Sequence, residues 1–126
     1  MNKARKPLTR EQIGRLATDI YKLLKDNGLW IDTSIYFNGN RIDNRDDDGN
    51  YHYDGVMYFH EDMDPRDCFE YVNPDHIISM TFEGPVYHMF NYDRNPSVLK
   101  KFNALLKRFG VCYELGDAWN LTCYYI

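Results

Sequence analysis

The side chains that could carry out chemistry are concentrated in an acidic segment in the middle of the chain. Residues 43–83 hold twelve acidic and two basic residues, a local net charge of −10 in a chain whose total is −4. Asn44, Asp46 and Asp48 alternate before a glycine, the order of the first half of an EF-hand calcium loop. The twelfth position is Gly55 rather than glutamate, so the second half is missing. A solvated turn is the plainer interpretation, and we expect no metal or other cofactor.

The histidines offer a second chemistry. His52 and His60 are eight residues apart, roughly 26 Å along an extended strand, which is too far to share one metal. His60, Glu61 and Asp64 form a carboxylate–imidazole group that a small hydrolytic or metal-dependent enzyme could use. No spacing singles this group out, and histidines half exposed on a sheet account for it more simply. An enzyme therefore stays the alternative interpretation.

The cysteines indicate the compartment rather than a reaction. Cys68, Cys112 and Cys123 have no zinc spacing, and an odd number cannot all pair. They predict free thiols in a reducing cytoplasm. The apolar runs are only a few residues long, so we expect no membrane span, and the basic start is not followed by a signal-like hydrophobic segment.

Apolar stripes at helical spacing predict two long helices that could position these groups. Thr9 and Gln12 form a capping box for a helix over 10–27. Asn95, with proline at the next position, begins a second helix that stops at Gly110.

Alternating apolar and polar residues predict the strands. We expect strands over 29–37 and 51–60, a central hairpin over 76–92 turning at Gly84-Pro85, and a last hairpin from 111–115 to 118–126 turning at Gly116-Asp117. Residues 38–50 are interpreted as a projecting polar connection, and Asp64-Pro65 as the start of a short helical turn ended by Asn73-Pro74. The order α-β-β-(short α)-β-β-α-β-β predicts an α+β fold, with a mainly antiparallel sheet of five to six strands and both long helices on one face. We expect one domain over 1–126 with a flexible basic segment at 1–7.

Basic residues on the two helices favour another alternative, RNA binding. The element order approaches that of a double-stranded-RNA-binding domain. The basic cluster such a domain needs on its second helix is only Lys100-Lys101, in a chain that is acidic overall. Helical lysines opposite an apolar stripe are ordinarily a solvated face, so we do not expect direct nucleic-acid binding.

Small, acidic α+β chains with many tyrosines, eleven in this sequence, resemble phage and mobile-element proteins that block host defence nucleases, anti-CRISPR inhibitors among them. The resemblance lies in size, charge and tyrosine content. It implies a non-enzymatic inhibitor whose acidic hairpin mimics nucleic acid and docks in the basic groove of a host protein. The predicted partner-binding residues are Asp43, Asp46, Asp47, Asp48, Tyr51, Tyr53 and Asp54. A homodimer through Leu121 to Ile126 is a further hypothesis, if that strand lies at a sheet edge.

Overall fold

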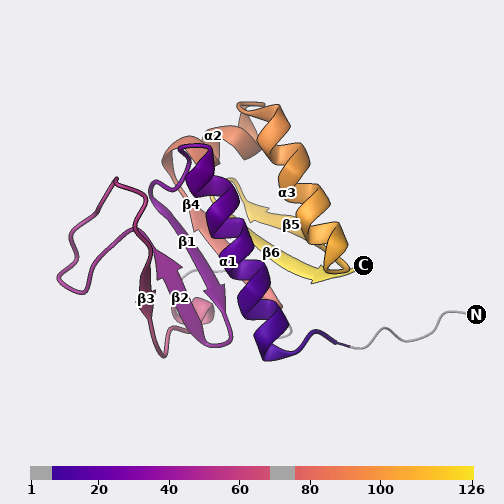
Figure 1. Cartoon of the computed structure of the whole chain (residues 1–126), viewed down its shortest axis with the longest axis horizontal. Helices are drawn as coiled ribbons and strands as arrows, with labels where there is room; N and C mark the ends of the chain where they lie inside the picture. Colours follow the sequence, from indigo (N-terminus) through magenta and orange to yellow (C-terminus); the bar gives the residue numbers. More distant parts are fainter. Residues whose placement is uncertain (1–6, 69–75) are drawn as a thin grey trace, which may run out of the picture.

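The computed structural model describes residues 7–68 and 76–126, which form a six-stranded antiparallel sheet with helices on one face (Figure 1). The elements in chain order are α1 (Arg10–Asp26), β1 (Thr33–Phe37), β2 (Asn40–Asp43), β3 (Tyr58–His60), the short 3-10 helix η1 (Pro65–Asp67), β4 (Ile78–Phe82), α2 (Gly84–Asn91), α3 (Pro96–Arg108), β5 (Val111–Asp117) and β6 (Asn120–Tyr125). The predicted α+β fold with two long helices on one face is confirmed. Residues 1–6 of the predicted flexible segment, and Asn73-Pro74, lie outside the described residues.

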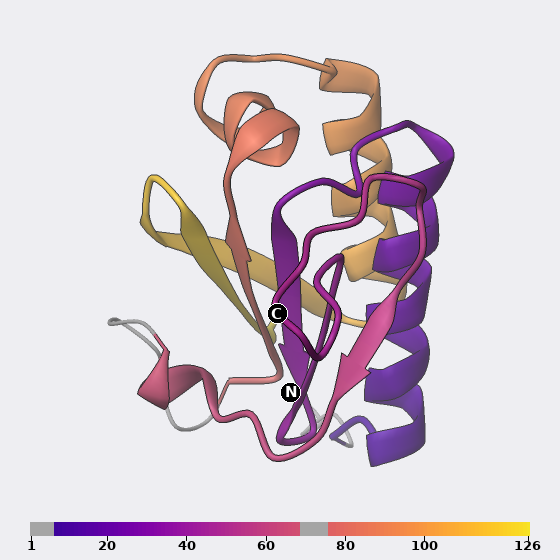
Figure 2. The ribbon, with the colours of Figure 1, turned by 90° about the vertical axis from the view of Figure 1, so that its left-hand side faces the viewer.

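The sheet order is β3-β2-β1-β4-β6-β5, so β1 and β4 lie at its centre. Helices α1 and α3 run along the same face, and Figure 2 shows them as one layer beside the sheet. The core between the layers is mainly apolar. It is formed by Leu16, Ile20 and Leu24 of α1, Phe102 and Leu106 of α3, and Ile35, Met80, Phe82 and Leu121 of the strands. Burial of these stripes holds the helices on the sheet.

The start of α1 has the predicted cap. The Thr9 side chain accepts a hydrogen bond from the Gln12 backbone N–H, and the Gln12 side chain accepts one from the Thr9 N–H. Two N–H groups that the helix itself leaves unpaired are thereby satisfied.

The prediction of one long connection over residues 38–50 is wrong. Phe37 pairs with Asn40, so Asn38 and Gly39 make a two-residue turn into β2. Their φ angles are 52° and 77°, the positive values that a type I′ hairpin turn requires. Strand β2 contains a single apolar residue, Ile42, so hydrophobic alternation could not reveal it.

The predicted strand over 51–60 is also mostly irregular. Only Tyr58–His60 form β3, and Tyr51 makes an isolated bridge with Arg45. Gly55 has a φ of 85°, in the left-handed region that favours glycine, and a Cβ added there would lie 3.4 Å from the side chain of Lys25.

The second half of the predicted central hairpin is a helix. Strand β4 is confirmed, but residues after Glu83 form α2, with proline in its first turn. Val86 and Met89, three positions apart, are both buried, which is helical spacing. The predicted hairpin turn at Gly84-Pro85 is therefore wrong, and β4 pairs instead with β1 and β6, where Thr81 lies between Ser34 and Asn120.

The last hairpin turns two residues later than predicted. Asp117 pairs with Asn120, so Ala118 and Trp119 form the turn, and the register shifts between Leu115 and Asp117. Strand β6 lies between β4 and β5, so the edge on this side is β5. The condition for a homodimer through Leu121 to Ile126 is not met.

Candidate functional site

The sheet face that points away from α1 and α3 is polar. Directly paired residues place their side chains on the same face. One cross-strand row contains Asp43, Ser34, Thr81 and Asn120, and the next contains Arg41, Tyr36, Ser79 and Thr122. Six of these eight residues are buried. Polar groups removed from water need partners, so this face is either an internal hydrogen-bond network or a binding site.

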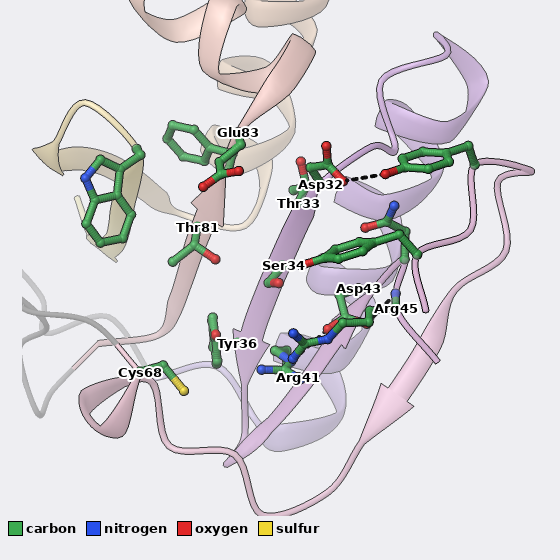
Figure 3. A pocket seen from close by; sticks show the side chains of 15 residues that line it. Asp32, Thr33, Ser34, Tyr36, Arg41, Asp43, Arg45, Cys68, Thr81 and Glu83 are labelled. Carbon is green, nitrogen blue, oxygen red and sulfur yellow. Dashed lines mark hydrogen bonds and ion pairs between the residues drawn. The ribbon is translucent and has the colours of Figure 1, made fainter. Parts of the chain in front are cut away.

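A cavity of about 460 Å³ lies over this face (Figure 3). Asp32 and Glu83 lie at one end, Ser34 and Thr81 in the middle, and Arg41, Tyr36 and Cys68 at the other end. Its volume is in the range of small-ligand sites. The walls are completed by Tyr51 and Tyr53 from the loop between β2 and β3 and by Trp119 from the β5–β6 turn.

A buried ionic group closes the lower end of the cavity. Arg41 Nε lies 2.8 Å from Asp43 Oδ2, as an ion pair rather than an aligned hydrogen bond. Asp43 Oδ1 also lies 2.9 Å from His60 Nε2 and accepts a hydrogen bond from the Arg45 N–H. Asp43 is only 3% exposed, so this carboxylate serves the scaffold and does not reach a partner.

Tyr36 packs against the same group. The Arg41 guanidinium carbon lies 5.9 Å from the centre of the Tyr36 ring. Burial raises the pKa of Tyr36, although a hydrogen bond with Arg41 opposes the shift. The Tyr36 hydroxyl is consequently protonated at neutral pH, because its pKa is raised from a value that is already high.

We define the acidic loop as residues 44–57, between β2 and β3. Asp46 organises its tip: its carboxylate accepts hydrogen bonds from the N–H groups of Asp48 and Asn50 and lies 2.7 Å from His52 Nε2. The His52 ring and then the Asn50 N–H hold the pKa of Asp46 below its usual value. Asp46 is therefore a structural residue of the loop.

Tyr21 of α1 and Trp30, four residues after the end of α1, fix the other half of the acidic loop. The Tyr21 hydroxyl donates to the Gly55 carbonyl, and Trp30 Nε1 donates to the Val56 carbonyl at 3.2 Å. Asn44 and His52 are joined by two further hydrogen bonds. The loop is thus anchored to the domain at several points along its length.

The remaining predicted site residues lie on the outside of this loop. Asp47, Asp48 and Asp54 are exposed, and Tyr51 and Tyr53 are 52% and 62% exposed. The structure therefore divides the seven predicted residues: Asp43 and Asp46 hold the loop in place, and the other five form an acidic and aromatic surface.

Asp32, Glu83 and Trp119 were not among the predicted site residues. Asp32 precedes β1 and Glu83 follows β4. Because these two central strands pair antiparallel, both residues lie at the same end of the strand pair. The Glu83 N–H donates to the Asp32 carbonyl at 2.9 Å. They are 51 positions apart in sequence, and the β1–β4 pairing brings them together.

The structure does not bring together the three residues of the enzyme alternative, His60, Glu61 and Asp64. His60 contacts Asp43 and Asp47, whereas Asp64 pairs with Arg66 at 2.8 Å and Glu61 is exposed. Within residues 7–68 and 76–126 no three histidine, cysteine or carboxylate side chains are placed to hold a metal ion. No helix among the described residues is long and apolar enough to cross a membrane.

The fold and the site define an α+β domain with a polar cavity beside an anchored acidic loop. Comparisons with protein families, characterised proteins and solved structures give no match. The chemistry of the site is therefore the basis for assigning a function.

Proposed function

We propose that this chain is a non-enzymatic binding protein that presents the outer surface of the acidic loop to a basic partner. The observation that supports this most is the combination of three exposed carboxylates and two exposed tyrosines on a loop with an anchored backbone. Tyrosine supplies rigid contact area at low entropic cost, and carboxylates supply steering toward positive charge.

Anchoring is what distinguishes this loop from a solvated connection. A mobile acidic loop would lose conformational freedom when it binds, whereas a loop held by internal hydrogen bonds has lost most of it on folding. Asp46 and His52 at the tip, and Tyr21 and Trp30 from below, supply those bonds. Val56 and Phe59, 43% and 49% exposed, add apolar area at the base of the loop.

The partner that fits this surface is a protein with a basic groove, of the kind that normally holds nucleic acid. The resemblance in size, charge and tyrosine content to phage and mobile-element inhibitors favours a host defence nuclease as the partner, with the carboxylates standing in for phosphates. The three free cysteines, two of them exposed, fit a reducing cytoplasm.

The proposal is tested by capture from a bacterial lysate, followed by measurement of the Kd for each captured protein. In the test variant Asp47, Asp48 and Asp54 are replaced by Asn. In the control variant Glu11, Asp26 and Asp93, which are exposed elsewhere, are replaced by Gln, Asn and Asn and change the charge equally. We expect the test variant to lose about 1–2 kcal/mol, about tenfold in Kd, at low salt and the control to lose little.

Competition supplies the second readout. Duplex DNA or RNA should displace the chain from its partner, because both occupy the same groove. Equal Kd values for wild type and test variant at low salt, or no displacement by nucleic acid, would refute the proposal.

A further inference from the structure

The upper end of the cavity has the composition of a cation site. Asp32 and Glu83 lie together there (Figure 3), and no ion pair joins either carboxylate to a basic side chain of the described residues. Glu83 occupies the N-cap position of α2 but makes no side-chain cap hydrogen bond, so its carboxylate is not used by the helix. Two neighbouring carboxylates without a counter-charge favour a bound cation.

Aromatic side chains border the same end. Tyr53 is 62% exposed, and its hydroxyl donates to Asp32 Oδ1 at 3.3 Å. Trp119, 42% exposed, lines the cavity from the β5–β6 turn. That turn is held in place because the Asn91 side chain donates to the Ala118 carbonyl at 2.6 Å and the Phe82 N–H donates to the Trp119 carbonyl at 2.9 Å. Aromatic faces beside carboxylates are the usual surroundings of a bound organic cation.

The polar face under the cavity is also incompletely paired. The side-chain amide of Asn120 is buried and makes no hydrogen bond to the described part of the chain. It is the cross-strand neighbour of Thr81, which lines the cavity. Buried polar groups are nearly always satisfied, so this amide leaves the polar row incomplete beside Thr81, although Asn120 itself does not line the cavity.

We infer that Asp32, Glu83, Tyr53 and Trp119 form a binding site for a guanidinium group. A guanidinium is planar, presents five donors in a fork that matches carboxylates and stacks on aromatic rings, whereas an ammonium is a compact point charge. The lower end of the cavity does not compete for it, since the Arg41 charge there is already paired with Asp43. The 460 Å³ volume accommodates an arginine side chain with water.

The group could come from a free guanidino compound or from an arginine of the basic partner. An arginine supplied by the partner rests on the proposed function, because a basic groove that holds nucleic acid is rich in arginine. In that complex the acidic loop would meet the groove and one arginine would enter the cavity beside it. Binding of a free guanidino compound does not depend on the proposed function.

The experiment titrates the protein with N-acetyl-arginine amide and follows Trp119. The only other tryptophan, Trp30, is 2% exposed, so a change in fluorescence, or in the indole N–H signal by NMR, reports the cavity. We expect a saturable change with arginine amide and none with N-acetyl-citrulline amide, its neutral analogue. Glu83→Gln and Asp32→Asn should each weaken binding at least about tenfold, and Glu114→Gln, exposed on β5, should not. Asparagine tolerates the positive φ of Asp32, which keeps that variant foldable.

Equal responses to arginine and citrulline amides, or unchanged binding by both carboxylate variants, would overturn the inference. A short arginine-containing peptide distinguishes the sources: binding equal to or tighter than that of arginine amide supports a side chain, and exclusion of the peptide supports a free compound. The Asn variant of Asp47, Asp48 and Asp54 should still bind arginine amide. If that variant also keeps its partner, the proposed function fails and the guanidinium site remains.

Discussion

Replacement of Asp43 by Asn should destabilise the domain strongly although it changes one atom. Asp43 is 3% exposed and has three polar neighbours: the Arg41 guanidinium, with Nε at 2.8 Å, His60 Nε2 at 2.9 Å and the Arg45 N–H at 2.9 Å. Asn keeps one acceptor oxygen, but its NH₂ group replaces the other oxygen and points at the positive or N–H groups that this oxygen faced. The guanidinium of Arg41 then remains buried without a counter-charge.

The expected loss in the free energy of unfolding is about 3–5 kcal/mol, the range for breaking one side of a buried ion pair. A domain of ordinary stability has about 5–15 kcal/mol in total, so much of it would be lost. With a urea slope of about 2 kcal/mol/M, the unfolding midpoint should fall by about 1.5–2.5 M. Asp48→Asn, exposed on the same loop, should stay within about 0.5 kcal/mol of wild type and serves as the control.

A double-mutant cycle separates the ion pair from simple loss of packing. Arg41→Met removes the buried cation, so the second change, Asp43→Asn, should cost less in that background by about 1–3 kcal/mol. Additive costs, or a loss below about 1 kcal/mol for Asp43→Asn alone, would refute the assignment of Asp43 as the counter-charge of the buried Arg41 guanidinium. Circular dichroism at several urea concentrations is sufficient for all four proteins.

Three further outcomes follow from single features of the structure. Gly39→Ala should lower the free energy of unfolding by about 1 kcal/mol because the φ of Gly39 is 77°; an added Cβ meets nothing within 4 Å, so the cost is backbone strain alone. Gly14→Ala inside α1 should raise the free energy of unfolding by about 0.5–1 kcal/mol, since its Cβ would make ordinary contacts at 3.9 Å. Urea unfolding tests both signs. A thiol reagent should label the exposed Cys68 and Cys112 in the native protein and Cys123 only after denaturation, because burial raises the pKa of Cys123 to about 12; mass spectrometry that finds three rapid labels in native buffer would contradict the structure. The Arg66 guanidinium and its backbone N–H lower the pKa of Asp64 from 3.8 to about 2, so the stability this carboxylate adds is complete above its unfolded pKa and lost as the pH falls toward 2; the urea midpoints of wild type and Asp64→Asn should therefore converge between pH 4 and pH 2.

The parts of the fold that sequence alone could predict are those with local, periodic causes. Apolar stripes and the Thr9 cap are sufficient for α1, and Asn95 with proline after it is sufficient for the start of α3. The class of fold follows from these helices and from the alternation in β1, β4 and β6.

The parts that failed have causes at longer range or of a different kind. Strand β2 has one apolar residue on its helix-facing side, and its place in the sheet comes from the Asn38-Gly39 turn and from pairing on both sides. Residues after Glu83 alternate well enough for a strand, but Pro85 has no N–H for a central ladder, and the first turn of a helix leaves that group unused. Greater weight on Asn-Gly as a hairpin signal and on proline as a first-turn residue would have found both elements.

Only the acidic loop of the candidate site was predictable from sequence, because its location follows from the charge of one segment. The acidic loop could be located by counting charges, but no count could assign its carboxylates, because Asp43 and Asp46 differ from Asp47 and Asp48 in what surrounds them and not in type. The cavity end at Asp32 and Glu83 could not be predicted at all, since it depends on the pairing of β1 with β4.

The two classes of carboxylate depend on each other. A chain with a local charge of −10 repels itself, and an unpaired acidic loop would spread into solvent and lose the fixed spacing that a partner can read. The inner carboxylates remove part of that repulsion by pairing: Asp43 binds Arg41 and His60, and Asp46 binds His52. Among the outer carboxylates, Asp48 and Asp54 make no ion pair within the described residues, and Asp47 lies 3.4 Å from His60 Nδ1. A substitution of Asp46 should therefore weaken partner binding mainly because it removes the hydrogen bonds that hold the loop tip. A substitution of Asp48 should weaken partner binding only through the lost charge and leave the loop conformation unchanged.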